Sequence, residues 1–205
     1  MSDVKHKIGI MGGTFDPIHT GHLVTAEAVC IEYGLEKVLF IPASNPPHKQ
    51  QSHVTDVMHR YIMTVMATYS NERFYVSPME IERAGLSYTI DTVLALIEQY
   101  GENTEFYFIT GADAIQELPT WREIDHLLDL CYFITATRPG VTCDLKSIQN
   151  LFGTKGRQRI QCLSTPDIEI SSTDIRERVR QGRSIKYIVP ESVEKYILKE
   201  GLYRT

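Results

Sequence analysis

Residues 12 to 22 read Gly12-Gly13-Thr14-Phe15-Asp16-Pro17-Ile18-His19-Thr20-Gly21-His22. An apolar segment, 7–11, precedes this run and an amphipathic segment, 23–33, follows it, so the pattern predicts a strand, a glycine turn and a helix. Glycines let backbone N–H groups approach an anion, and a helix start adds unpaired N–H donors and the positive end of its dipole. His19 and His22 are three residues apart and therefore share one side of the first helical turn. The run indicates a phosphate site at the end of a strand.

Other interpretations of this run explain less of it. It lacks the Gly-x-Gly-x-x-Gly dinucleotide fingerprint, and the chain contains no Gly-Lys-Ser or Gly-Lys-Thr of a Walker A loop. On spacing alone His19 and His22 could ligate zinc, but zinc needs a third ligand from elsewhere and leaves the glycines unexplained. For an isolated His-x-x-His pair, a plain strand-to-helix turn with solvated histidines is the simplest alternative.

Strand-like and helical segments alternate along most of the 205 residues. We expect strands at 7–11, 37–43, 73–79, 105–110, 131–136 and 158–163, and helices at 22–33, 55–70, 89–99, 112–118, 121–130, 144–151, 172–180 and 191–199. Gly34 is expected to end the first helix and Thr55 to cap the second. This alternation predicts a doubly wound parallel α/β sheet in one domain, 1–205, with a small helical C-terminal part from about residue 172.

Composition is that of an ordinary globular protein, with 42% hydrophobic and 23% charged residues. The net charge of −5 gives no basic excess, which argues against duplex nucleic acid as a partner. No apolar run approaches the ~20 residues of a membrane span, and no signal peptide is recognised. None of the four cysteines forms a Cys-x-x-Cys pair, so we expect a reduced, cytoplasmic compartment, with Cys30 and Cys131 as small core residues.

Charge is distributed unevenly along the chain. Residues 98–129 carry eight acids and one basic residue, whereas residues 176–204 carry eight basic residues and four acids. The ordinary explanation for both is a solvated helix face.

Further motifs follow other predicted strands and so should lie at the same edge of the sheet. Asn45-Pro46-Pro47-His48-Lys49 follows the second strand, and its prolines stiffen a loop that projects two cationic side chains. A surface turn with a solvated lysine is the alternative. Trp121, the only tryptophan, follows Pro119 in a polar loop and is either a stacking platform or a packing aromatic.

Two predicted helix starts offer free N–H donors. The segment 87–92, Ser-Tyr-Thr-Ile-Asp-Thr, could accept a carboxylate there, or could be a helix cap and nothing more. The segment 170–176, Ile-Ser-Ser-Thr-Asp-Ile-Arg, adds hydroxyls and an arginine one turn in, which favours a second anion site. Ser171 or Ser172 as a simple N-cap is the alternative there.

The run at 12–22 resembles the signature of the nucleotidyltransferase superfamily, whose members share a His-x-Gly-His element. In its full form it looks most like the bacterial nicotinate-mononucleotide adenylyltransferases. The Pro-Pro-His-Lys element, Thr137-Arg138-Pro139-Gly140 and the segment 170–176 match the same family in the same order. The resemblance extends from Lys7 to Tyr203 and is weakest over residues 141–165. It implies a Rossmann-like fold.

The resemblance also implies a reaction, the transfer of the adenylyl group of ATP to nicotinate mononucleotide in NAD biosynthesis. The phosphate of the mononucleotide would attack directly, giving nicotinate adenine dinucleotide and pyrophosphate, so no Ser or Cys nucleophile is needed. Mg²⁺ would travel with the ATP phosphates, without a dedicated metal cage. The catalytic residues would be His19, His22 and Arg176, which would stabilise charge on the departing pyrophosphate.

Binding residues follow by position within the matching motifs. ATP would be bound by Gly12, Gly13, Thr14, Phe15, His19, His22, Gly111, Asp113, Arg138, Ser171, Ser172, Thr173 and Arg176. The mononucleotide would be bound by Asn45, His48, Lys49, Tyr88, Thr89 and Trp121.

Two alternatives remain open at this point. The first is another transferase of the superfamily, acting on phosphopantetheine, nicotinamide mononucleotide or a CTP-derived group. The second is a non-catalytic nucleotide-binding module, against which the intact histidine pair argues. A homodimer is compatible with the sequence, which decides neither the oligomeric state nor the strictness of nicotinate over nicotinamide.

Overall fold

The computed structural model describes residues 5–46, 54–83, 85–137, 145–166 and 168–204. In this part of the chain one sheet of six parallel strands runs through the molecule in the order β3-β2-β1-β4-β5-β6. The strands are β1 His6–Gly13, β2 Lys37–Pro42, β3 Phe74–Val76, β4 Thr104–Gly111, β5 Cys131–Thr137 and β6 Ile160–Ser164. The expected doubly wound α/β fold is confirmed, and its strand order reverses between β1 and β4.

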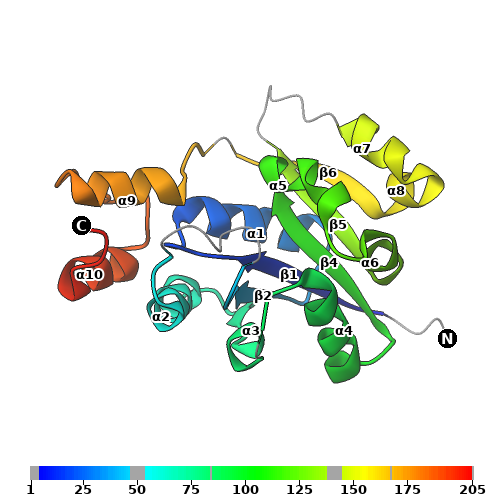
Figure 1. Ribbon diagram of the computed structural model, residues 1–205, viewed down its shortest axis with the longest axis horizontal. Coiled ribbons are helices and arrows are strands. Elements are labelled where there is room, and N and C mark those ends of the chain that lie inside the picture. The colour runs from blue at the N-terminus through cyan, green and yellow to red at the C-terminus, as the bar shows by residue number, and fades with distance from the viewer. Residues whose placement is uncertain (1–4, 47–53, 84, 138–144, 167, 205) are drawn as a thin grey trace.

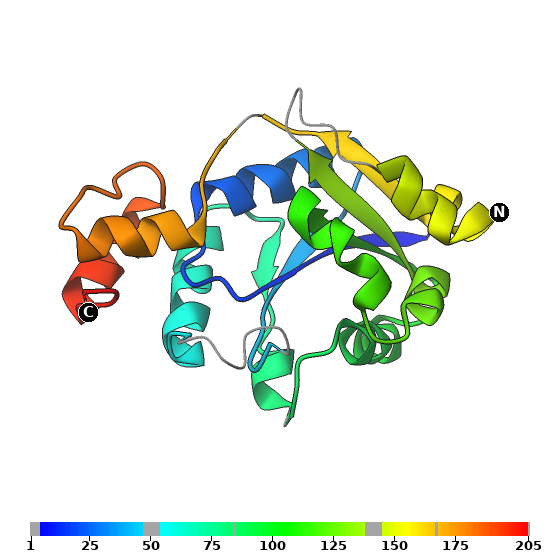
Figure 2. The same cartoon turned by 45° about the horizontal axis from the view of Figure 1, so that its top comes forward.

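Helices cover both faces of this sheet (Figure 1). They are α1 Thr20–Glu32, α2 Val57–Thr68, α3 Met79–Glu82, α4 Thr89–Tyr100, α5 Ala112–Gln116, η2 Leu118–Thr120, α6 Ile124–Leu130, α7 Leu145–Leu151, α8 Gly153–Arg159, α9 Ser172–Arg180 and α10 Glu191–Glu200. Helices α9 and α10 lie beside each other at one end of the long axis, beyond the sheet (Figures 1 and 2). They form the helical C-terminal part that the sequence predicts.

Alternate residues of the strands point to opposite faces, so the sheet has a hydrophobic core on each side. In β4, Phe106 and Phe108 pack with the side chains of α4, α6 and α7, whereas Tyr107 and Ile109 pack with those of α1 and α2. Cys30 and Cys131 are fully buried in these cores, as expected.

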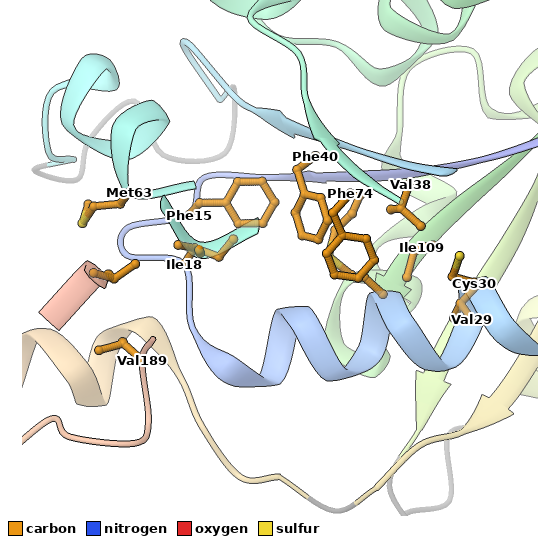
Figure 3. Close-up of a cluster of buried hydrophobic side chains, with 14 of the residues drawn as sticks. Phe15, Ile18, Val29, Cys30, Val38, Phe40, Met63, Phe74, Ile109 and Val189 are labelled. Carbon is orange, nitrogen blue, oxygen red and sulfur yellow. The ribbon is translucent and has the colours of Figure 1, made fainter. Parts of the chain in front are cut away.

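Two residues of the glycine-histidine run belong to the core around α1 and α2. Phe15 and Ile18 are 3% and 0% exposed, and the Phe15 ring lies 6.0 Å from that of Phe40, which in turn packs on Phe74 (Figure 3). The loop that follows β1 is therefore anchored in the interior rather than lying on the surface.

Several element boundaries differ from the expected ones for local reasons. Asp56, not Thr55, caps α2, because its carboxylate accepts the Met58 N–H at 2.9 Å while the Thr55 N–H is donated elsewhere. The strand expected over 73–79 ends at Val76, and α3 begins directly after Pro78. The helix expected from 121 begins at Ile124, after a left-handed residue at Glu123.

Helix α8, in a stretch whose sequence pattern is ambiguous, was not expected. Gly34 does end α1, with the positive φ of +61° that favours glycine.

Candidate active site

A cleft of about 670 Å³ opens where the strand order reverses, between the carboxyl ends of β1 and β4. Ligands of doubly wound sheets bind at this switch point. The ends of β1 and β4, the first turns of α1 and the start of α9 all contribute to its wall. The lining residues are Met11, Gly12, His19, Gly21, His22, Val24, Thr25, Ile109, Thr110, Gly111, Ala114, Ala136, Thr165, Pro166, Ile168, Glu169, Ile170, Ser171 and Ser172.

The segment 12–19, which we call the motif loop, carries the chain from β1 into α1. Phe15 adopts φ +49° in this loop, and Asp16 and His19 are 4% and 6% exposed. His19 is the N-cap of α1, so both histidines stand at the helix start as the sequence predicts. Gly21 favours the packing here, because a Cβ at this position would lie 3.1 Å from Nδ1 of His19 and the imidazole would have to shift. The glycine between the histidines thus makes room for the first imidazole.

The two imidazoles form one unit. Their ring centroids lie 3.7 Å apart, and the Phe15 ring meets His22 edge-on at 5.1 Å. The backbone N–H of His19 donates to Nδ1 of His22 at 3.2 Å, which places the proton of the neutral His22 ring on Nε2. Nδ1 of His19 is buried and has no hydrogen-bond partner among the described residues. An unsatisfied buried nitrogen is costly, and such groups recur at functional sites.

Burial determines the charge of both rings. It lowers the pKa of His19 from 6.5 to about 4, and it lowers the pKa of His22 well below 6.5, with a further contribution from His19. Both rings are therefore neutral near pH 7 in the free protein. They can act there as hydrogen-bond donors and acceptors rather than as fixed positive charges.

The start of α9 contacts the motif loop through hydrogen bonds. Ser171 caps this helix by accepting the Asp174 N–H at 3.1 Å, as the simpler sequence interpretation expected, and it also lines the cleft. Ser172 Oγ donates to the Pro17 carbonyl at 2.9 Å. Arg176 donates to the Asp16 carbonyl at 2.6 Å and to Thr173 Oγ1 at 3.2 Å.

Arg176 is thus bound to the motif loop and is not among the residues that line the cleft. Two of its five N–H donors are used in these bonds, and its expected contact with ATP stays a prediction.

Of the residues expected to bind the mononucleotide, the structure brings Asn45, Tyr88 and Thr89 together on the other side of β1. Ser87 joins the loop after β2 to the start of α4, since its Oγ accepts the N–H groups of Ser44 and Asn45 and its own N–H donates to the Asn45 carbonyl. Tyr88 is the N-cap of α4 and Thr89 its first residue. Two distant segments of the sequence therefore meet at one point of the sheet edge.

Trp121 lies next to this group, half-buried, between two core aromatics. Its ring meets Phe108 and Phe133 edge-on, at 5.5 Å and 5.9 Å. The adjacent Arg122 lies over the Tyr88 ring at 4.8 Å, which connects Trp121 to the start of α4. The tryptophan packs on the core, and its partial exposure is compatible with a stacking platform as well.

The structure describes only some of the remaining expected site residues. Gly12 and Gly111 line the cleft, and Asp113 lies in α5 directly after β4, though its side chain is outside the described part of the structure. His48, Lys49 and Arg138 lie outside the described residues. Their roles stay predictions, as do those of Thr14, Phe15 and Thr173.

A buried polar network lies behind the motif loop, and the sequence analysis did not predict it. Asp16 accepts the Tyr203 hydroxyl at 2.8 Å and the Thr55 N–H at 3.2 Å, and Arg60 donates to the Thr14 carbonyl at 2.6 Å. Burial, followed by the charge of Asp16, raises the pKa of Tyr203. One signal was present in the sequence: Arg60 shares the buried stripe of α2 with Met63, where an apolar residue is expected.

Within the described ranges, no three His, Cys, Asp or Glu side chains are grouped so as to hold a metal ion. The third ligand that a zinc site at His19 and His22 would need is therefore not among these residues. In the same part of the chain no helix combines the length and apolar character needed to cross a membrane.

Comparison with known proteins places the chain in a family. Residues 10–178 match the model of the cytidylyltransferase-like family. A probable nicotinate-nucleotide adenylyltransferase of Thermoanaerobacter sp. (strain X514) is 55% identical over 203 residues, covering 97% of this chain and 94% of the relative. One from Moorella thermoacetica is 53% identical, covering 97% and 92%.

Solved structures share the fold. The nicotinic acid mononucleotide adenylyltransferase of Plasmodium falciparum, complexed with NaAD, superposes with a TM-score of 0.77 at 22% identity, with 97% of each chain covered. The match to the family model spans the motif loop, the cleft and the start of α9, and the two bacterial relatives match nearly the whole chain. The chain belongs to the cytidylyltransferase-like family, among its nicotinate-nucleotide adenylyltransferases.

Proposed function

We propose that this protein transfers the adenylyl group of ATP to nicotinate mononucleotide. An oxygen of the mononucleotide phosphate attacks the α-phosphorus of ATP, the bond from that phosphorus to the bridging oxygen breaks, and pyrophosphate leaves. The observation that carries the proposal is the pair of adjacent histidine rings at the N-terminus of α1, in a cleft at the switch point of the sheet. The chain would contribute position and hydrogen bonds rather than a covalent nucleophile.

The histidines are assigned to the phosphates of ATP. With Nδ1 of His22 held by the His19 N–H, its Nε2–H is the donor left for a phosphate oxygen. His19, whose Nδ1 has no partner, is the second candidate, and Gly12, Gly13 and Thr14 supply backbone N–H groups nearby. Arg176 would add a permanent positive charge through the donors that Asp16 and Thr173 leave unused.

The acceptor is assigned to the group around the start of α4. The N–H groups of the first turn of α4, which begins at Thr89, suit the carboxylate of nicotinate, and Trp121 offers a ring beside them for the pyridine. The Tyr88 N–H donates to the Leu86 carbonyl at 3.1 Å, so Tyr88 is proposed to contact the mononucleotide through its side chain. His48 and Lys49, on the loop after β2, are proposed to contact the mononucleotide phosphate. Gly111, Asp113, Arg138, Ser171, Ser172 and Thr173 are proposed for the ATP side.

Mg²⁺ is proposed to enter with ATP, bound mainly by phosphate oxygens and water. Magnesium keeps several of its waters and is usually held through substrate phosphates in nucleotide enzymes, so a substrate-carried ion needs no protein cage. We place the enzyme in the cytoplasm, where its nucleotide substrates are found, and leave the homodimer as the assembly to be tested by light scattering.

A coupled pyrophosphate assay tests this function directly. Purified protein is given Mg²⁺-ATP with nicotinate mononucleotide, nicotinamide mononucleotide or phosphopantetheine, one at a time. We expect rapid pyrophosphate release with nicotinate mononucleotide and much slower release with the others. Tight ATP binding without pyrophosphate release from any acceptor would instead identify a non-catalytic module.

A further inference from the structure

Arg60 has an unusual place for an arginine. Its side chain is buried on the inner side of α2, and 1% of the surface of Arg60 is exposed. Within the described chain it forms no ion pair, and its donors go to four backbone carbonyls instead. These are Thr14 at 2.6 Å, Ala43 at 2.8 Å, Thr55 at 2.8 Å and Ser44 at 3.4 Å.

Three of the four carbonyls, those of Thr14, Ala43 and Ser44, come from the point at which β1 and β2 separate, and the Thr55 carbonyl directly precedes α2. The two strands pair in register up to Gly13 and Pro42, and the Ala43 N–H adds a last bond to the Gly13 carbonyl at 2.8 Å. Beyond that bond the motif loop turns toward α1, and residues 43–46, which we call the acceptor loop, turn toward the start of α4. A single nitrogen of Arg60, Nη1, joins the Thr14 and Ala43 carbonyls across the gap.

A buried cation at this point carries an energetic cost that a merely space-filling residue would avoid. Burial lowers the pKa of Arg60, with Asp16, Tyr203 and Asp56 acting in the opposite direction. The guanidinium offers five donors in one rigid plane, so it can satisfy carbonyls from three segments at fixed mutual positions. An apolar side chain of the same size would leave these half-buried carbonyls without this donor.

We propose that Arg60 is a positioning residue for the transfer reaction, because it fixes the motif loop and the acceptor loop relative to each other. This inference rests on the proposed function, in which the motif loop binds ATP and the acceptor loop leads to the mononucleotide. In-line transfer needs the attacking oxygen within about 3–3.5 Å of phosphorus, and a displacement of about 1 Å can cost roughly 10²-fold in rate. Arg60 touches neither substrate in this assignment.

The proposal predicts a split between binding and turnover. In Arg60→Lys the cation remains, but an ammonium cannot span the carbonyls that the planar guanidinium joins. We expect the Kd of a non-cleavable ATP analogue alone, and that of nicotinate mononucleotide alone, to stay within about threefold of wild type. The kcat should fall about 10- to 100-fold, and the dinucleotide product, which spans both loops, should bind about tenfold or more weakly.

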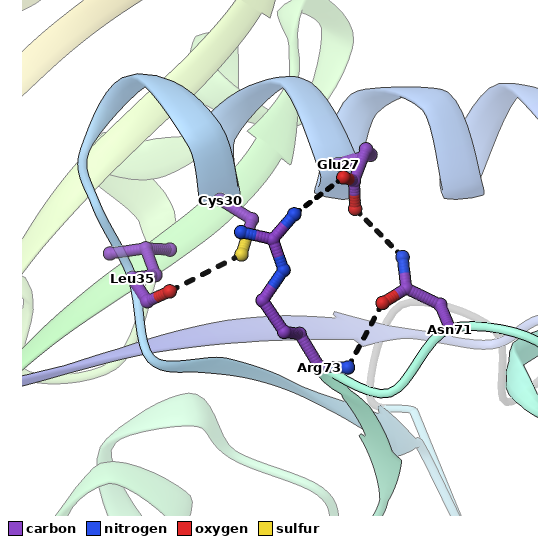
Figure 4. A network of polar contacts seen from close by, with 5 residues as sticks. All are labelled: Glu27, Cys30, Leu35, Asn71 and Arg73. Carbon is purple, nitrogen blue, oxygen red and sulfur yellow. Dashed lines mark hydrogen bonds and ion pairs between the residues drawn. The ribbon is translucent and has the colours of Figure 1, made fainter.

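Arg73→Lys provides the matched control. Arg73 bonds to Glu27 at 2.6 Å, beside Asn71, in a network between α1 and the start of β3, at the edge of the sheet opposite the carboxyl ends of the strands (Figure 4). The same substitution there should leave kcat and all three affinities within about threefold. Thermal unfolding of both variants shows whether they are folded under the assay conditions.

Hydrogen exchange on the wild-type protein gives a second measurement that needs no variant. If Arg60 joins the loops, the ATP analogue alone should slow exchange at residues 43–45 as well as in the motif loop. Normal wild-type turnover with an unchanged Arg60→Lys kcat, loss of one substrate's affinity alone, or protection confined to the loop of the added ligand would each overturn the positioning role. Absence of pyrophosphate release by the wild type would instead refute the proposed function.

Discussion

The two sides of the cleft edge are constructed differently. On the side of α1, most of the motif loop is buried. Arg176 and Ser172 donate to its carbonyls, and the Asp16 carboxylate accepts from neighbouring segments, through hydrogen bonds at 2.6 to 3.2 Å. On the side of α4, the Ser87 hydroxyl joins the acceptor loop to α4 and Arg60 joins it to α2, whereas Trp121 and Tyr88 are held by ring contacts.

This difference suggests a division of roles. A side built from backbone groups and buried imidazoles provides a fixed place for a triphosphate, whichever acceptor is used. A side built from loops and partly exposed rings is where the choice of acceptor can change without disturbing the sheet. Substitutions on the two sides should therefore fail in different ways.

His22→Ala should have the largest effect. Loss of a preorganised donor to the transferring phosphates costs roughly 2.7–4 kcal/mol, or about 10²–10³ in kcat, with substrates at saturation. His59→Ala is the control, because His59 bonds to the Tyr196 hydroxyl at 2.8 Å away from the cleft. A His22→Ala kcat within about threefold of wild type (~0.7 kcal/mol) would remove His22 from the catalytic residues.

The protonation of His19 should be visible as a pH dependence of stability. Its pKa is about 4 in the folded protein and 6.5 ordinarily, so the unfolded chain takes up the proton first as the pH falls. The contribution of His19 is present above pH 6.5 and is lost progressively down to about pH 4.

The loss amounts to about 3 kcal/mol, at about 1.36 kcal/mol per pH unit. Urea unfolding at pH 7 and pH 4 should show that wild type loses about that much more stability than His19→Asn, in which asparagine keeps a good N-cap. Equal losses in both proteins would mean that His19 is not buried in its neutral form.

Trp121→Ala tests the α4 side of the cleft. Stacking of one base on an aromatic ring contributes about 1–3 kcal/mol, so the affinity for nicotinate mononucleotide should fall by this amount while that for the ATP analogue changes little. Trp121→Phe keeps a ring and should recover most of the affinity. Equal weakening of both ligands by Trp121→Ala would assign the tryptophan to packing on Phe108 and Phe133 alone.

Tyr203→Phe should have the smallest effect. It removes the hydroxyl that donates to Asp16 at 2.8 Å and keeps the ring. The free energy of unfolding should fall by about 1 kcal/mol, the usual value for one buried hydrogen bond. Chemical denaturation measures it, and a change below 0.3 kcal/mol (roughly the experimental error) would show that Asp16 finds another donor.

The sequence predicted the fold class, the edge of the sheet at which the motif loop lies and the histidine pair at a helix start, because apolar periodicity and glycine positions are local signals. Ser171 and Ser172 were likewise readable as a helix start. The contacts of Arg60, and the bond between Asp16 and Tyr203, could not be predicted from the sequence, since each depends on which segments meet in three dimensions.

The protonation state of the two histidines could not be predicted from the sequence either. Burial, which depends on packing by Phe15 and the rest of the motif loop, decides it. The residues whose contacts sequence reasoning missed, Asp16, Arg60 and Tyr203, lie behind the histidines and hold the motif loop in place.

The bond between Asp16 and Tyr203 joins residues 187 positions apart. During synthesis from the N-terminus, the motif loop leaves the ribosome well before residue 203, and its buried carboxylate receives this donor only when residue 203 has emerged. Contacts of such large sequence separation form late, after the intervening strands have paired. The histidine site therefore has its motif loop long before the residue that supplies this bond, and the loop lacks this donor until helices α9 and α10 are in place.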